Sequence, residues 1–126
     1  MMNSGSETMG KDLSVSVLLD FYKQLLTQKQ SDALDLYYNQ DLSLSEIAQH
    51  MGITRQGVRD NIKRGEKQLL SYEEELGLAG KFARVSALCD VVNRYLERLS
   101  EMNLPDSANE YLADIKYHME QITDIV

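Results

Sequence analysis

The sequence predicts an all-α fold, and three observations support this. Apolar residues recur every three or four positions through most of the 126-residue chain, the spacing that gives a helix one buried face. The chain has only one proline, so few positions would interrupt a helix. Capping-box patterns, in which Ser or Thr is followed three residues later by Glu or Gln, occur at Thr27, Ser43 and Ser107, and each predicts a helix N-terminus.

The first 40 residues are expected to contain a disordered segment and two helices. Residues 1–12 are rich in Ser, Gly and polar side chains and lack periodicity, so we expect them to be disordered. A first helix is predicted over about 14–26, and a second from the Thr27 cap to about Asn39. The expected buried positions are Val15, Leu18, Leu19, Tyr22, Leu25 and Leu26 in the first helix, and Ala33, Leu34, Tyr37 and Tyr38 in the second.

Residues 43–69 have the pattern of a helix-turn-helix. The Ser43 capping box begins a short amphipathic helix that is expected to end at Met51. Gly52 ends it, because glycine adopts the left-handed conformation of a tight helix exit at little steric cost. Thr54 is then placed to cap a second helix that begins one residue later.

The second helix of this motif is expected to carry a basic face. Val58 and Ile62 point inward, so at about 100° per residue the polar side chains gather on the opposite side. Arg can pair with guanine edges and Gln with adenine, and both Lys and Arg neutralise phosphates. The candidate nucleic-acid-binding residues are Thr54, Arg55, Gln56, Arg59, Lys63, Arg64 and Lys67.

The rest of the chain predicts long amphipathic helices. Heptad spacing of apolar residues indicates that the basic helix continues as one rod to about Leu76, with Gly65 allowing another helix to approach closely. After a loop at 77–80, a long helix is expected to end near Asn103, and a final helix to begin at the Ser107 capping box.

This pattern predicts two parts, a helix-turn-helix domain at 13–78 and a C-terminal helical arm at 79–126. The apolar stripes of the long helices exceed what a core of this size can cover. We therefore expect the arm to bury its stripe in a homodimer. Residues 73–75, three consecutive Glu, are expected to lie on a solvated face.

The motif resembles known bacterial proteins. The run I-A-x-x-M-G-I-T-R-Q-x-V-R at 47–59 resembles region 4 of sigma factors. The longer segment 18–78, with LLTxKQ, YYxxDLSLSEIA and GITRQGVxDNIKRxE, resembles the YlxM family of small proteins. This resemblance implies an all-α, sigma region 4-like helix-turn-helix bundle extended by long amphipathic C-terminal helices. It also implies a gene beside those of the signal recognition particle, and a regulatory or accessory role in that targeting pathway.

Two residues of the second helix depart from the sigma pattern. Asn61 stands where sigma factors usually have an inward Ile, and Gly57 lies within the first turns of the helix. Glycine in a helix interior costs about 1 kcal/mol relative to alanine. Both differences argue against assigning the promoter recognition of sigma factors to this chain.

The charge distribution limits nucleic-acid binding. The chain has a net charge of −7. Residues 54–68 carry five basic and two acidic groups, whereas 1–53 carry three and seven and 69–126 carry five and eleven. Because only the second helix is basic, we expect modest affinity that depends strongly on salt.

Other classes of function find little support in the sequence. His50 and His118 have no partners at metal-ligand spacing and no glycine-rich phosphate loop is present, so we expect no enzyme activity, no metal and no cofactor. Cys89 is the single cysteine and lies on an apolar stripe, where a core role is expected. The lone cysteine and the short apolar runs predict a cytoplasmic protein that does not enter a membrane.

Three interpretations remain open. The first is DNA binding by a dimer, with the basic helix in a major groove. The second is an accessory of the signal recognition particle, which binds that particle's RNA through the basic face or a basic protein through the acidic tail. The third is a purely structural interaction module. We favour a nucleic-acid-binding regulatory protein linked to the targeting pathway.

Overall fold

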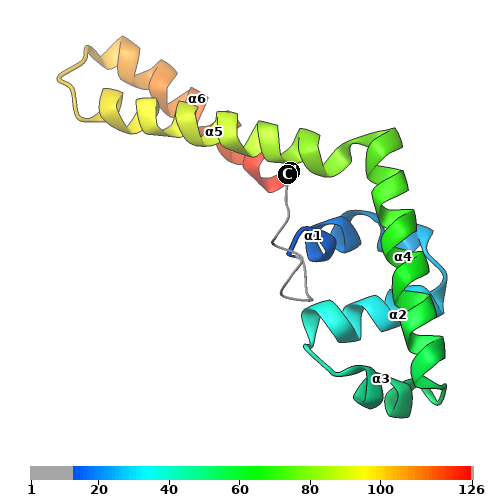
Figure 1. Ribbon diagram of the computed structural model, residues 1–126. Coiled ribbons are helices and arrows are strands. Elements are labelled where there is room, and N and C mark those ends of the chain that lie inside the picture. Colours follow the sequence, from blue (N-terminus) through cyan, green and yellow to red (C-terminus); the bar gives the residue numbers. More distant parts are fainter. Residues whose placement is uncertain (1–12, 126) are drawn as a thin grey trace. The chain divides into compact units, whose positions relative to one another are not determined.

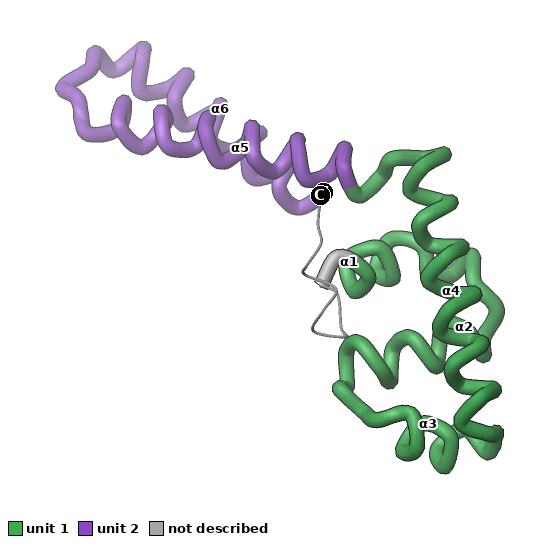
Figure 2. The backbone as a smooth tube through the Cα atoms, in the orientation of Figure 1, with its two compact units in different colours: residues 1–79 green, residues 80–126 purple. Residues whose placement is uncertain are grey.

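The computed structural model describes residues 13–125, and every regular element in this range is helical (Figure 1). The all-α prediction is therefore confirmed. The predicted disorder of residues 1–12 lies outside the described residues. The elements are α1 (Leu13–Tyr22), η2 (Lys23–Leu25), α2 (Gln28–Leu34), η3 (Asp35–Asn39), α3 (Leu44–Met51), α4 (Arg55–Leu76), α5 (Leu78–Ser100) and α6 (Asp106–Ile125). They form two compact units, residues 1–79 and 80–126 (Figure 2).

The first helix is shorter than predicted. α1 ends at Tyr22, and the chain continues as the 3-10 turn η2, which is closed by a 3.1 Å bond from the Leu26 N–H to the Lys23 carbonyl. A 3-10 turn has three residues per turn, so it rotates later side chains off the stripe that α1 defines. The prediction that Leu25 is buried is accordingly wrong, since its side chain is 53% exposed.

The second helix begins and ends near the predicted positions. Thr27 and Gln30 form both bonds of a capping box, each 3.2 Å long. The last turn widens into η3, a π-helix of five residues. Asp41 then turns the chain with a φ of +60°, a left-handed conformation that Asp adopts more readily than most residues.

α1, α2 and α3 pack against one side of α4, which crosses α2 closely (Figure 1). Gly65 makes this close crossing possible, because a Cβ atom at that position would lie 2.5 Å from Leu34 Cδ1. Leu34 is fully buried in the core. The buried apolar residues of this unit are Val15, Leu18, Leu19, Tyr22, Ala33, Leu34, Leu36, Ile47, Val58, Ile62 and Leu69.

A buried hydrogen-bond cluster joins α1 to the end of α4. The Tyr22 hydroxyl donates to Glu73 Oε1 at 2.5 Å and accepts the Leu78 N–H at 3.0 Å, while the Ala79 N–H donates to the same Glu73 oxygen at 3.1 Å. Burial, together with the adjacent Glu73 carboxylate, raises the pKa of Tyr22 above its ordinary value. The prediction that Glu73 is solvated is therefore wrong, since it is half-buried.

The same cluster determines where α5 begins. A loop was predicted at 77–80, whereas α5 begins at Leu78. Gly77 alone makes the turn, with a φ of +62°. Tyr22 and Glu73 then accept the first N–H groups of α5, which have no partner within the helix.

α5 and α6 form an antiparallel hairpin in the second unit (Figure 2). Its seam buries Cys89, Leu96 and Leu112, and the Lys116 ammonium donates to the Ser100 hydroxyl across it. α5 ends at Ser100, three residues before the predicted end.

The capping box predicted at Ser107 is wrong, because α6 already begins at Asp106. The Pro105 carbonyl accepts the Asn109 N–H at 3.0 Å, so the first bond of the helix starts at the proline. Proline is tolerated at this position, because a residue that precedes the first turn donates no N–H bond within the helix.

Candidate nucleic-acid interface

The first helix of the motif is held by caps at both ends. The Ser43 hydroxyl accepts the Glu46 N–H at 3.1 Å, and the Ser43 N–H donates to the Glu46 carboxylate at 2.8 Å. Ile47 is fully buried and fixes the helix on the core. The predicted helix at 44–51 is confirmed in both its limits and its capping box.

The turn between the two helices is tight and well bonded. Gly52 has a φ of +69°, and its N–H and that of Ile53 both donate to the Ala48 carbonyl, at 2.9 and 3.1 Å. The Thr54 hydroxyl accepts the Gly57 N–H at 2.9 Å, which begins α4 at Arg55. The predicted Gly52 turn and Thr54 cap are therefore confirmed.

α4 is a continuous helix of 22 residues, about 33 Å long at 1.5 Å per residue. The predicted rod is thus confirmed. Val58, Ile62, Gly65 and Leu69 are buried along its inner face. Leu76, the last position of the predicted heptad, is instead 45% exposed, because the turn at Gly77 follows immediately.

The seven candidate residues, Thr54, Arg55, Gln56, Arg59, Lys63, Arg64 and Lys67, are all exposed. At 100° per residue, Gln56, Lys63 and Lys67 lie near the centre of the outer face, and Arg55 and Arg64 lie on its two flanks. Within residues 13–125, none of the five cations forms a salt bridge. Their charge is therefore available to an anionic partner.

Two of the candidates are already engaged in hydrogen bonds. The Gln56 amide donates to the Asp60 carboxylate at 3.0 Å, one turn along α4. That bond orients the Gln56 amide and places one negative charge within the basic face. Thr54 uses its hydroxyl oxygen to cap the helix, so its first contribution is to position Arg55.

Gly57 and Asn61 occupy the side of α4 next to the turn. A Cβ atom on Gly57 would lie 3.2 Å from Thr54 Oγ1 and 3.5 Å from Ile53 Cδ1, so a side chain there would crowd the cap. The Asn61 amide donates to the Gly57 carbonyl at 2.9 Å. This bond satisfies a half-buried polar group at the place where a sigma factor has an apolar one.

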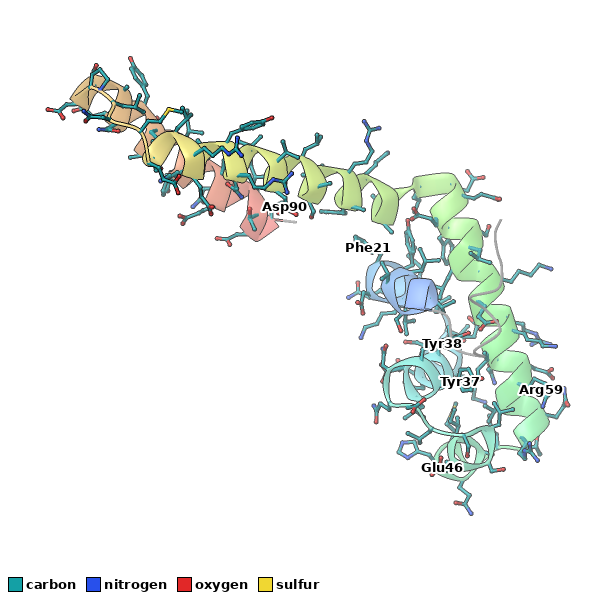
Figure 3. The ribbon with its side chains drawn as sticks, turned by 60° about the vertical axis from the view of Figure 1, so that its left-hand side comes forward. Phe21, Tyr37, Tyr38, Glu46, Arg59 and Asp90 are labelled. Carbon is teal, nitrogen blue, oxygen red and sulfur yellow. The ribbon has the colours of Figure 1, made fainter. Side chains whose placement is uncertain are left out.

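A groove of about 300 Å³ adjoins the basic face. Tyr37 and Tyr38, labelled in Figure 3, line it from η3, with their rings edge-to-face at 5.0 Å. Arg59 and Lys63 line it from α4. The Tyr38 hydroxyl donates to the Glu66 carboxylate of α4. Sequence reasoning placed these tyrosines in the core and missed the groove. Both rings are half-buried, and no local sequence signal indicates that η3 meets α4 at this point.

Other kinds of site are not seen in the part of the chain that the structure describes. Residues 13–125 contain no cluster of three or more His, Cys, Asp or Glu side chains suited to hold a metal ion. His118 lies 3.5 Å from Asp114, and both side chains are exposed. No helix in this range combines the length and apolar character needed to cross a membrane.

Comparison with known proteins agrees with this architecture. The family model UPF0122, described as helix-turn-helix proteins of the YlxM/p13-like type, matches residues 9–110. A UPF0122 protein of Acetivibrio thermocellus is 46% identical over 121 residues, covering 94% of this chain and 98% of the relative. A UPF0122 protein of Desulforamulus reducens is 38% identical over 112 residues, covering 88% and 95%.

A third relative, the UPF0122 protein of Exiguobacterium sibiricum, is 40% identical over 109 residues, covering 86% of this chain and 96% of its own length. These matches extend through the helix-turn-helix and into the C-terminal helices. Membership of a helix-turn-helix family suggests a binding or regulatory role. The chain belongs to the UPF0122 family of YlxM/p13-like helix-turn-helix proteins.

Proposed function

We propose that this protein is a cytoplasmic, homodimeric regulatory protein that binds nucleic acid through the outer face of α4. The observation that carries the proposal is the set of five exposed cations on the second helix of a helix-turn-helix, none of which is neutralised by another described residue. The second helix of such a motif enters the major groove, where Arg, Lys and Gln contact bases and phosphates.

The charge of the whole chain sets the strength of this binding. The net charge is −7, so the surface beyond α4 repels a polyanion. If all five cations of one subunit contact phosphates, the slope of log K against log salt on duplex DNA is about −4.5, and it is about −9 when both subunits of the dimer bind. Binding is therefore expected to be modest at physiological salt and to rise steeply as salt falls.

The finer part of the proposal concerns the target. The YlxM resemblance seen in the sequence implies a link to the signal recognition particle, so the regulated process would be protein targeting. The alternative is an accessory factor that binds the particle's protein without binding DNA. For that role the relevant surface is α6, which carries five carboxylates and one lysine and suits a basic protein partner.

Fluorescence anisotropy can separate these branches. The labelled ligands are a pool of duplex DNA, the RNA of the signal recognition particle and the protein of that particle, each titrated across a salt series. The test variant combines Arg59→Ala with Lys63→Ala. A matched control, Lys23→Ala with Lys29→Ala, removes two positive charges from exposed positions on other elements.

Each outcome selects one branch. Weaker binding of DNA or RNA by the α4 variant alone supports a nucleic-acid interface on that face. Equal affinities for the wild type, the α4 variant and the control on every nucleic acid would refute it. Saturation by the protein ligand alone would favour the accessory role.

A further inference from the structure

The α5–α6 hairpin leaves most of its large apolar side chains exposed. Cys89, Leu96 and Leu112 are its only large apolar residues in the buried class within 80–125. The exposed ones are Val85, Leu88, Val91, Val92, Tyr95, Leu99, Met102, Tyr111, Ile115, Tyr117, Ile122 and Ile125. An apolar surface of this extent on one small unit marks an interaction site.

On α5 these exposed residues follow a heptad. Val85, Leu88, Val92, Tyr95 and Leu99 are separated by three, four, three and four residues, and their exposed fractions run from 37% to 62%. This spacing is that of the a and d positions of a coiled coil. The seam of the hairpin uses a different set of positions, so this is a second, unpartnered stripe.

α6 repeats the same arrangement. Tyr111, Ile115, His118, Ile122 and Ile125 are separated by four, three, four and three residues, and all five are exposed. The residues of the hairpin seam again occupy neighbouring positions, with Leu112 buried and Met119 half-buried. Both helices therefore carry two adjacent heptad stripes, of which only one is covered.

The two uncovered stripes lie on the same side of the hairpin. In each helix the stripe lies one residue before the seam, as in Leu88 before Cys89 and Tyr111 before Leu112. One residue is a rotation of about 100°, close to the right angle between the two contacts of a helix in a four-helix bundle. α5 and α6 run antiparallel (Figure 1). The same offset in both helices therefore turns both stripes to one face of the hairpin.

We propose that this face binds a second copy of the chain, so that two hairpins form an antiparallel four-helix bundle in which α5 packs against α6 of the partner subunit. This inference rests on the homodimer of the proposed function and specifies the interface of that dimer. It does not depend on which nucleic acid α4 binds.

Charge complementarity selects both the occupant and its orientation. α5 carries four basic and two acidic side chains, whereas α6 carries one lysine and five carboxylates. Contact of α5 with a second α5, or of α6 with a second α6, would bring like charges together at the flanks of the heptads. Contact of α5 with the partner subunit's α6 pairs opposite charges on both sides of the bundle.

The size of the face is also sufficient. α5 has 23 residues and is about 35 Å long, and two helices of about 10 Å diameter make a face of roughly 700 Å². A stable interface of standard size buries about 600–1,000 Å² on each partner, and this face falls within that range. With neighbouring helices antiparallel, the two-fold axis runs along the bundle, so the two copies of α4 lead into it at the same end.

The test introduces charge on the stripe and compares it with the same charge on the opposite face. Leu88→Glu with Ile115→Glu changes two exposed stripe residues, and Ala83→Glu with Ala113→Glu changes two exposed residues away from it. Analytical ultracentrifugation at tens of micromolar reports the mass, and far-UV circular dichroism reports the helix content. We expect twice the 14.4 kDa chain mass for the wild type and the control, and one chain mass for the stripe variant.

A wild-type monomer would refute the homodimer itself, while a stripe variant that stays dimeric would refute this interface and leave the rest of the proposed function standing. A second experiment tests the interface without the stripe variant, in case that variant does not fold. In a Cys89→Ala background, chains with Val92→Cys are mixed with chains with Ile115→Cys and oxidised. A disulfide-linked dimer of the two different chains supports the arrangement, and linkage of Val92→Cys chains to one another would overturn it.

Discussion

The close crossing of α2 and α4 predicts that Gly65→Ala destabilises the protein when residue 34 is Leu and stabilises it when residue 34 is Ala. Gly65→Ala would place a Cβ atom 2.5 Å from Leu34 Cδ1 and 3.3 Å from Leu34 Cγ. Leu34 is fully buried, so relieving the contact requires its side chain to repack within the core or the two helices to move apart. The position of α4 on the core, and hence of its basic face, depends on this contact.

The magnitude follows from two opposing terms. Overpacking of a filled core costs about 1–3 kcal/mol, whereas alanine is more favourable than glycine in a helix by about 1 kcal/mol. We expect Gly65→Ala to lower the free energy of unfolding by about 1 kcal/mol. Leu34→Ala alone should cost about 2–5 kcal/mol, because it leaves a cavity. In that background the clash is gone, and Gly65→Ala should stabilise the protein by about 1 kcal/mol.

Urea unfolding followed by circular dichroism at 222 nm measures all four members of this double-mutant cycle. The predicted coupling energy between the two sites is about 2 kcal/mol, well above the error of such a cycle. If Gly65→Ala has the same effect on the free energy of unfolding in both backgrounds, the proposed contact between α2 and α4 is wrong.

Three further predictions concern the caps, the turn and the buried tyrosine of the helix-turn-helix unit. Ser43→Ala should cost about 1 kcal/mol in urea unfolding, since it removes the capping box of α3, whereas Ser45→Ala on the exposed side should cost less than half of that. Asp41→Val should cost about 1–2 kcal/mol and Asp41→Asn almost nothing, because a β-branched residue is strained at a φ of +60°; thermal melting would detect the difference. The raised pKa of Tyr22 means that the folded state holds this proton more tightly than the unfolded state, so its contribution to stability is full below pH 10 and is lost as the pH rises through the folded pKa. Between pH 9 and 12 the urea midpoint of Tyr22→Phe should therefore fall less than that of the wild type, while the exposed-site variant Tyr117→Phe should follow the wild type.

Helix starts that depend on adjacent residues could be predicted from the sequence. The caps at Thr27, Ser43 and Thr54 and the turn at Gly52 use groups within five residues of one another, so a short motif contains all their partners. Wrong predictions arose where a distant residue decides the outcome. Tyr22 and Glu73 are 51 residues apart, and their contact converts an expected loop into the first turn of α5.

At the candidate site, too, local features could be predicted and features that depend on distant residues could not. Exposure of Arg59 and Lys63 follows from helical periodicity, because the buried positions of α4 fix the outer face. The groove beside them requires η3 to pack on α4, and the angle of that packing depends on the π-helical turn at 35–39. A π-helix of one turn has no clear sequence signature, so this part of the surface emerged only from the structure.

The most direct test of the central claim is the salt dependence of duplex DNA binding, measured by fluorescence anisotropy for the wild type and for Arg59→Ala with Lys63→Ala. If both side chains contact phosphates, the slope of log K against log salt should become shallower in the variant by about 1.8 for each α4 helix bound, and by about 3.6 when both subunits of the dimer engage the duplex. The Lys23→Ala with Lys29→Ala control should keep the wild-type slope. An unchanged slope in the α4 variant would contradict the assignment of α4 as the nucleic-acid-binding helix.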